Sequence, residues 1–109
     1  MKKVSVVILN WNGVGMLQKF LPKVVEYSVN QGVEICVADN ASTDESVSYL
    51  QTNFPDVRLI LMDKNYGFAK GNNLAVEYTL KYDNPDYVLL LNNDTIVDPD
   101  FLENMIQVA

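Results

Sequence analysis

Clusters of asparagine and aspartate follow each of four apolar runs in the sequence, and their side chains could bind a ligand. The clusters stand at residues 10–13, 39–44, 63–67 and 92–95. Such residues are common in turns, because they tolerate left-handed backbone and bond to their own backbone. Their recurrence after four successive runs is hard to assign to turns alone, and it predicts a polar ligand site. Because the chain has no histidine, the site must work through carboxylates, amides and backbone groups.

The apolar runs before these clusters are predicted strands. They cover residues 4–9, 33–38, 57–62 and 87–91. The runs are nearly continuous instead of alternating, which is typical of strands buried on both faces of a parallel sheet. We therefore expect the strands to form the centre of the domain and the polar clusters to follow their carboxyl ends.

Helices are predicted between the strands, over residues 15–28, 42–53 and 68–82. Pro22 should kink or split the first of them. The second should begin at Ser42, because Ser42 and Glu45 have the spacing of a capping box. A last helix should begin at Asp98, with Pro99 in its first position.

Alternating strands and helices with right-handed crossovers predict an open parallel α/β sheet with helices on both faces. In such sheets ligands bind beyond the carboxyl ends of the strands, where the strand order reverses. A chain of 109 residues is enough for a single domain. No capping signal closes the last predicted helix before Ala109, so we expect the chain to be the N-terminal part of a longer protein.

Composition excludes several classes of protein. The net charge of -6 and the pI near 4.3 argue against binding to nucleic acid or to anionic membranes. A hydrophobic content of 49% supports a folded core. No apolar run reaches the roughly 18 residues of a membrane span, and no signal peptide is evident. We therefore expect a soluble cytoplasmic protein, in which the single cysteine, Cys36, is a buried small hydrophobe.

Two carboxylates narrow the class of ligand. Neither a dinucleotide fingerprint nor a P-loop follows the first strand. Asp39, at the end of the second strand, is placed to accept hydrogen bonds from a base or a ribose. Asp94 is a hard oxygen ligand of the kind that Mg²⁺ or Mn²⁺ uses together with substrate phosphates. A nucleotide diphosphate with a divalent ion would satisfy both positions, and the metal would hold the phosphates on an acidic protein.

At these residues the chain resembles the inverting family 2 glycosyltransferases of GT-A fold. The resemblance rests on residues 4–13, 37–46, 65–73, 89–95 and 99–102, which follow one another in the family's order and spacing. It covers nearly the whole chain and implies the Rossmann-like, nucleotide-binding half of a GT-A fold. The asparagine-rich blocks are most similar to the rhamnosyltransferase-like branch of the family.

The resemblance implies a site for a nucleotide-diphosphate sugar, with Mg²⁺ or Mn²⁺ held by Asp94 and the nucleotide. Trp11 would stand where the family has an aromatic residue against the base, and Asp39 would accept from the base edge. Asn92 and Asp94 match the ends of the family's D-x-D motif, so Asn92 would keep a ribose contact without the charge. The implied binding residues are Leu9, Asn10, Trp11, Asn12, Asp39, Asn40, Gly67, Lys70, Asn72, Asn73, Asn92, Asn93 and Asp94.

One departure from the family concerns the diphosphate. The family often has arginine at the position of Asn72, so this contact is either missing or supplied by Lys70. The implied reaction transfers the sugar with inversion to a hydroxyl of a polysaccharide, a lipid-linked or another acceptor. The catalytic base would lie beyond Ala109, so this part alone should bind donor weakly and be inactive. The full-length protein could lie peripherally at the inner membrane.

Two other classes stay open. Another Rossmann-like nucleotide-binding domain would bind NAD or S-adenosylmethionine in place of a nucleotide sugar. A non-catalytic assembly module would self-associate through the fourth strand if that strand is an unpaired edge. A two-component receiver is disfavoured, because it needs paired acids where this chain has Asn10 and Asn12. The nucleotide-sugar interpretation requires Trp11, Asp39 and Asp94 to surround one hollow at the same edge of the sheet.

Overall fold

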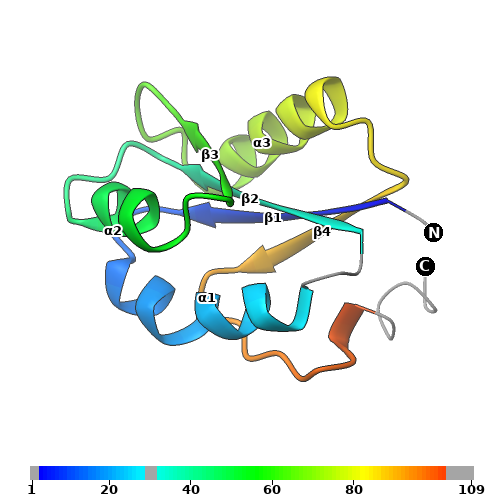
Figure 1. Cartoon of the computed structure of the whole chain (residues 1–109). Coiled ribbons are helices and arrows are strands. Elements are labelled where there is room, and N and C mark those ends of the chain that lie inside the picture. Colours follow the sequence, from blue (N-terminus) through cyan, green and yellow to red (C-terminus); the bar gives the residue numbers. More distant parts are fainter. Residues whose placement is uncertain (1–2, 29–31, 103–109) are drawn as a thin grey trace.

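The computed structural model describes residues 3–28 and 32–102, in which strands and helices alternate (Figure 1). The strands are β1 (Val4–Asn10), β2 (Val33–Asp39), β3 (Arg58–Leu61) and β4 (Tyr87–Asn92), and the helices are α1 (Val14–Ser28), α2 (Ser46–Asn53) and α3 (Phe68–Tyr82). All four strands are parallel, in the order β3-β2-β1-β4. The predicted open parallel α/β sheet is confirmed.

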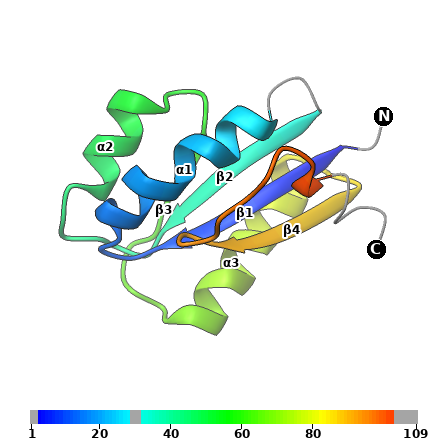
Figure 2. The same cartoon turned by 90° about the horizontal axis from the view of Figure 1, so that it is seen from below.

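The strand order places the reversal between β1 and β4. From β1 the chain moves outward to β2 and β3, and it then crosses to the other side of β1 to form β4 (Figure 2). In the register, Leu9 lies opposite Asn92, so these two strands end at the same level. An open α/β sheet has its crevice at such a reversal, which makes the carboxyl ends of β1 and β4 the place to look for a ligand.

Helices cover both faces of the sheet, as predicted. Helices α1 and α2 lie on one face and α3 lies on the other (Figures 1 and 2). Successive side chains of β1 point to opposite faces, so Val6 and Ile8 enter the larger core beside α1 and α2. Val7 enters the smaller core beneath α3, together with Cys36 and Ala75. The buried position predicted for Cys36 is confirmed, and burial raises the pKa of its thiol to about 11.

The outer strands are less buried than predicted. β1 and β2 are buried on both faces, but β3 and β4 are only partly buried, and Leu61 and Leu90 are 60% and 50% exposed. A continuous apolar run does not reveal which strands become the edges of a sheet. Here β3 and β4 are the edges of the described sheet, and α3 packs on β1 and β2. The edge position of β4 in the described sheet meets the condition stated above for self-association, which itself stays a prediction.

Two helix predictions need correction. Pro22 does not split α1, which is continuous, while the kink predicted as the other outcome stays a prediction. Pro22 and Gln18, whose carbonyl lacks its usual partner, both lie on the exposed side of the helix. Helix α2 begins at Ser46 and not at Ser42, so the predicted capping box is wrong. The Ser42 hydroxyl instead donates to Asp39 Oδ1 at 2.7 Å, while Asp44 Oδ1 accepts from the Ser46 N–H at 2.9 Å.

The last predicted helix lies mostly outside the described residues. Its predicted start is a turn, in which the Asp98 carboxylate accepts from the Asp100 N–H at 3.0 Å. Phe101 and Leu102 are helical and reach the core on the α1 side. Residues 103–109 lie outside the described part. Over the described residues, no helix combines the length and the hydropathy that crossing a membrane requires.

Candidate functional site

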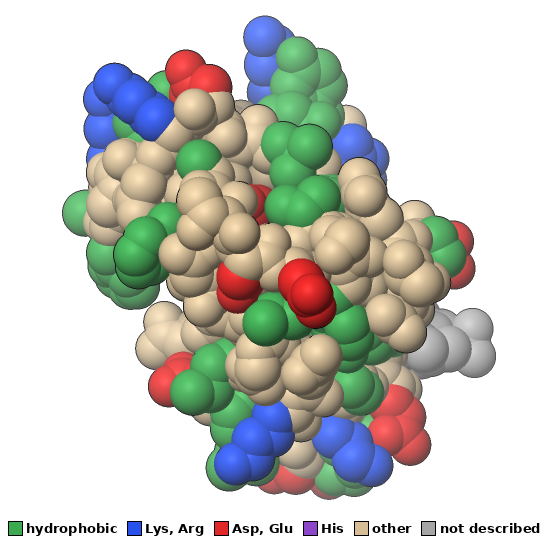
Figure 3. Space-filling model, turned by 90° about the vertical axis from the view of Figure 1, so that its left-hand side faces the viewer, with side chains coloured by type: hydrophobic (Ala, Val, Ile, Leu, Met, Phe, Trp, Pro, Cys, Tyr) green, Lys and Arg blue, Asp and Glu red, His purple; other side chains and the backbone are tan. Residues whose placement is uncertain are grey.

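A cavity of about 640 Å³ opens at the carboxyl ends of β1 and β4. Its volume is typical of small-molecule sites. Figure 3 looks onto this end of the sheet, where uncharged polar groups, hydrophobic side chains and acidic side chains lie near the centre and basic side chains lie toward the rim. The cavity is lined by Leu9, Trp11, Asn40, Asn65, Gly67, Phe68, Ala69, Asn72, Asn73, Leu90, Leu91, Asn92, Asn93 and Asp94.

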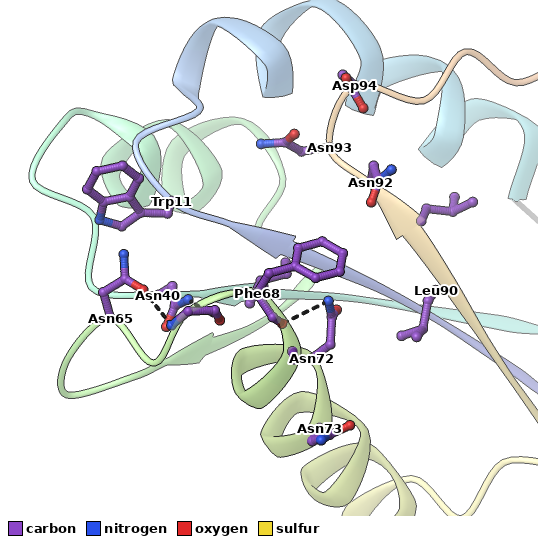
Figure 4. Close-up of a pocket in the computed structure, with 14 residues that line it drawn as sticks. Trp11, Asn40, Asn65, Phe68, Asn72, Asn73, Leu90, Asn92, Asn93 and Asp94 are labelled. Carbon is purple, nitrogen blue, oxygen red and sulfur yellow. Dashed lines mark hydrogen bonds between the residues drawn. The ribbon is translucent and has the colours of Figure 1, made fainter.

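Trp11 and Asp94 come from opposite ends of the chain and line the same cavity (Figure 4). Trp11 is 54% exposed, so much of its ring is free to pack on a ligand. Phe68, at the first position of α3, is 70% exposed and adds a second aromatic surface. The Asp94 carboxylate is exposed and has no hydrogen-bond partner among the described residues. The cavity therefore combines aromatic surface with one free negative charge.

Asp39 does not line this cavity, which corrects the predicted hollow of Trp11, Asp39 and Asp94. It is 2% exposed. Its Oδ1 accepts from Asn10 Nδ2 at 3.1 Å and from the Ser42 hydroxyl at 2.7 Å, and its Oδ2 accepts from the Ser42 N–H at 2.8 Å. A buried carboxylate requires such donors, and the protein itself supplies them here. A contact of Asp39 with the base stays a prediction.

Asn10 and Asn12 also bond within the protein, and neither lines the cavity. Asn10 is buried, and its Oδ1 accepts from Asn93 Nδ2 at 3.0 Å. Asn12 has a left-handed backbone with φ 49°, and its Oδ1 accepts from the N–H groups of Thr43 and Asp44 at 2.7 and 3.1 Å. These bonds join the loops that follow β1, β2 and β4. Asn12 lines a neighbouring cavity of about 450 Å³ beside α1, which Asp94 also lines.

Gly13 allows these loops to approach one another closely. A Cβ atom at this position would lie 2.4 Å from Asn93 Nδ2 and 2.6 Å from Asn10 Oδ1. Any side chain here would therefore push apart the two amides that connect the ends of β1 and β4.

The side chain of Asn40 holds the loop after β3 in place beside the cavity through hydrogen bonds. Its Oδ1 accepts from the Tyr66 N–H at 2.9 Å, and its Nδ2 donates to the Gly67 carbonyl at 3.1 Å. Asn65 Oδ1 accepts from the Gly67 N–H at 2.7 Å. Lys70 does not line the cavity, because its Nζ lies 5.1 Å from the centre of the Tyr66 ring. Its predicted contact with the diphosphate has no counterpart in this geometry and stays a prediction.

The remaining predicted residues do line the cavity. They are Leu9, Gly67, Asn72, Asn73, Asn92 and Asn93 in addition to Trp11, Asn40 and Asp94. Asn72 Nδ2 donates to the Phe68 carbonyl at 3.1 Å, so its oxygen is the atom left for a ligand. Sequence reasoning missed five lining residues, Asn65, Phe68, Ala69, Leu90 and Leu91. The first three stand in the block at 65–73 that carried the resemblance, whereas Leu90 and Leu91 were assigned to a fully buried strand.

Two aspartates near the cavity stay charged at neutral pH. Burial by itself would raise the pKa of Asp44, but hydrogen bonds from Ser46 and from the Val14 N–H outweigh it and lower that pKa overall. The Tyr66 hydroxyl donates to Asp63 and lowers the pKa of that carboxyl. Both carboxylates serve loop structure, so Asp94 is the lining residue whose charge is left for a ligand.

Asp94 suits a divalent ion only together with other oxygen donors. Within residues 3–28 and 32–102, no three His, Cys, Asp or Glu side chains gather into a metal-binding group. The Asp94 carboxylate and the Asn92 amide both line the cavity, at the end of β4 (Figure 4). This set of oxygen ligands fits Mg²⁺ or Mn²⁺, which commonly complete their shell with phosphate and water.

Comparison with solved structures shows the same fold. A structure of S. aureus TarS, residues 1–349, matches with a TM-score of 0.78 at 20% identity, over 96% of this chain and 31% of that chain. Mannosyltransferase PcManGT from Pyrobaculum calidifontis matches with a TM-score of 0.78 at 23% identity, over 97% of this chain and 32% of that one. These likenesses confirm the expected GT-A type of fold.

Sequence comparison reaches the same group of proteins. Chondroitin synthase from Escherichia coli is 33% identical over 91 residues, which are 78% of this chain and 12% of that protein. The chain thus spans only a small part of this relative. The sequence model of the family described as Glycosyl transferase family 2 matches residues 5–109. Since that match covers nearly the whole sequence, the chain belongs to glycosyltransferase family 2.

Proposed function

We propose that the chain binds the donor of a glycosyltransferase, a nucleotide-diphosphate sugar, in the cavity between the ends of β1 and β4. The observation that carries this proposal is the shared position of Trp11 and Asp94 on that cavity. Solved relatives support the class of ligand: TarS was solved with UDP-GlcNAc, and the mannosyltransferase with GDP-Man and Mn²⁺.

The proposed arrangement puts the base beside Trp11 and the diphosphate beside Asp94. Aromatic surface stabilises a stacked base, and Trp11 and Phe68 are the aromatic residues of the lining. Asp94 and the Asn92 amide would hold Mg²⁺ or Mn²⁺ together with the phosphates. When bound, such an ion stabilises the negative charge that develops on the leaving diphosphate.

In the complete enzyme, an acceptor hydroxyl oxygen would bond to the anomeric carbon of the sugar as the bond to the diphosphate breaks, with inversion. Following the family resemblance, we place the base that takes the hydroxyl proton outside these 109 residues. The chain by itself should therefore bind nucleotide without turnover. By the same resemblance we assign the enzyme to the rhamnosyltransferase-like branch, and from composition we assign it to the cytoplasm.

Asp94→Ala in the full-length enzyme tests this function. We expect loss of metal-dependent transfer and at least about a tenfold weaker binding of UDP or GDP in the presence of Mn²⁺, because the metal loses its carboxylate. Asp56→Ala removes the same charge from an exposed residue that does not line the cavity, and it should change neither result. Unchanged transfer by the Asp94 variant at saturating donor would contradict the assignment.

A second proposal concerns the edge of the sheet. β4 ends the described sheet, and Leu90 on it is 50% exposed. Unpaired edge strands promote association, so we propose that the 109-residue chain self-associates. Sedimentation at several concentrations should show a rising mass, and a monomer at all concentrations would exclude this.

A further inference from the structure

A second cavity adjoins the proposed donor cavity at Asp94, which lines both. Its volume is about 450 Å³, and it lies beside the start of α1. A smaller cavity of about 190 Å³ follows it along the same helix, and Lys19 and Phe20 line both of these cavities. Together they form one groove between residues 12–23 and residues 94–97, here named the α1 groove.

The groove forms because the chain turns back after β4. Residues 95–100 run beside α1 (Figures 1 and 2), and Phe101 and Leu102 then enter the core on that side of the sheet. Helix side chains three or four residues apart share one face. The α1 side chains that line the groove have this spacing, and they are Met16, Lys19, Phe20 and Lys23.

Two of these side chains give the groove positive charge. Lys19 forms no ion pair among the described residues, and its Nζ lies 5.3 Å from the centre of the Phe20 ring. Lys23 pairs with Glu26 at 3.0 Å, but both side chains are more than half exposed, and such pairs contribute little free energy. Although the chain has a net charge of -6, two ammonium groups one helical turn apart can therefore receive an anion here.

The groove also offers apolar surface and an amide donor. Met16 and Ile96 are exposed, and Phe20 is partly buried. The Asn12 bonds use its Oδ1 and its backbone N–H, so its Nδ2 has no partner among the described residues. A sugar has apolar C–H faces and hydroxyls at its rim, which suit the apolar side chains and the amide. A carboxylate or phosphate on the same molecule suits the lysines.

The position of the groove connects it to the proposed reaction. The proposed function puts the diphosphate of the donor beside Asp94. The sugar joined to that diphosphate, and the hydroxyl that displaces the diphosphate, must lie close to the same residue. A molecule along the groove would bring one end to Asp94 and its middle to Lys19.

We propose that the α1 groove binds the acceptor, and that this acceptor is an anionic saccharide whose carboxylate or phosphate is held by Lys19. This inference rests on the proposed function and names a substrate class that the donor cavity leaves open. The acceptor hydroxyl oxygen bonds to the anomeric carbon as the bond to the diphosphate breaks, and its proton leaves to the base outside these 109 residues. Lys19 binds the acceptor and takes no part in that proton transfer.

Lys19→Gln tests the inference, because it removes the charge and keeps most of the side-chain length. The probes are two matched pairs, tetragalacturonate with its methyl ester and trehalose phosphate with trehalose. Calorimetric titration of the full-length enzyme with UDP and Mn²⁺ present gives the affinity ratio of charged to neutral probe. At least one ratio should exceed about five in the wild type and fall toward one in Lys19→Gln. The pair that responds distinguishes a carboxylate from a phosphate.

Lys81→Gln is the matched control. Lys81 is an exposed helix lysine whose Nζ lies 5.4 Å from the centre of the Tyr82 ring, but it lines neither the donor cavity nor the α1 groove. The variant loses the same charge and should keep the wild-type ratios. Ratios near one in the wild type, or ratios lowered equally by the two lysine changes, would overturn the inference.

Titration with UDP and GDP alone separates this inference from the function on which it rests. If nucleotide binds while the probe ratios stay near one, the inference fails and the proposed function stands. If neither nucleotide binds, the proposed function fails, and the assignment of the groove to an acceptor fails with it.

Discussion

Two groups of polar residues at the same edge of the sheet use similar side chains for opposite purposes. The first, here named the protein-bonded group, follows β1 and β2 and consists of Asn10, Asn12, Asp39, Ser42 and Asp44. The second, named the cavity-facing group, comes from α3, from the loop before it and from the end of β4, and consists of Asn65, Asn72, Asn92 and Asp94. Side chains of the first group bond to other loops, whereas each of the second lines the cavity.

The difference shows that residue type at a strand end does not identify a ligand contact. A buried polar atom must find a partner within the protein or lose free energy. Asp39 and Asn10 have partners within the protein, and their hydrogen bonds hold three loops together. Asp94 has none among the described residues, so its charge is free for a ligand. The useful criterion is hydrogen-bond capacity left over after folding.

Asp39→Ala should have the largest effect on stability. It removes the acceptor of Asn10 Nδ2 and of the Ser42 N–H in a buried setting. We expect the free energy of unfolding to fall by about 2–4 kcal/mol, because donors are left unsatisfied. Urea denaturation measures this, with Asp94→Ala as the matched change in the cavity-facing group, where a loss below about 0.5 kcal/mol is expected.

The same pair of variants can contradict this division into a protein-bonded and a cavity-facing group. If Asp39→Ala keeps its stability and loses nucleotide binding, Asp39 is a ligand contact after all and belongs with the cavity-facing group.

Trp11→Ala should weaken binding with little effect on folding. Its ring is 54% exposed in the cavity, and loss of a stacking surface costs about 1–3 kcal/mol per base, roughly a fivefold to hundredfold rise in Kd. Calorimetric titration of the nucleotide that the wild type binds best checks this. Tyr82→Ala removes an exposed aromatic from the other end of α3 and should leave the affinity as it is. Equal losses in the two variants would argue against stacking on Trp11.

Asp44→Asn should have the smallest of these effects, and the stability that it removes should depend on pH. Its carboxylate accepts from the Val14 and Ser46 N–H groups at the starts of α1 and α2, and its pKa is lowered in the folded protein. A lowered pKa means that this stabilisation is complete above the unfolded value, near pH 4, and is lost as the pH falls through the folded pKa. The urea midpoint of the wild type should therefore exceed that of Asp44→Asn at pH 7, and the two should converge toward pH 3. A constant difference across that range would assign the effect to geometry instead of charge.

Much of the fold could be read from the sequence because local signals were strong. The apolar runs predicted the ends of all four strands to within one residue, and Gly67 marked the start of α3 correctly. The helix start predicted at Ser42 was wrong. The spacing of Ser42 and Glu45 fits a capping box, but the Ser42 hydroxyl bonds to Asp39 in the same loop instead. The burial predicted for Leu90 was also wrong, because an apolar residue on an edge strand looks the same in the sequence as one in the core.

What the sequence alone determined was the inventory: parallel strands with crossover helices, asparagine and aspartate at each strand end, and blocks that assign the chain to its family. The tertiary structure decided the order β3-β2-β1-β4, which puts Trp11 and Asp94 on one cavity. It also decided which polar side chains form their hydrogen bonds within the protein, as Asp39 does, and which keep a hydrogen-bonding atom free for a ligand, as Asn65 does. The physical reason is that strand order and hydrogen-bond saturation depend on contacts between residues far apart in the chain, which local patterns do not encode.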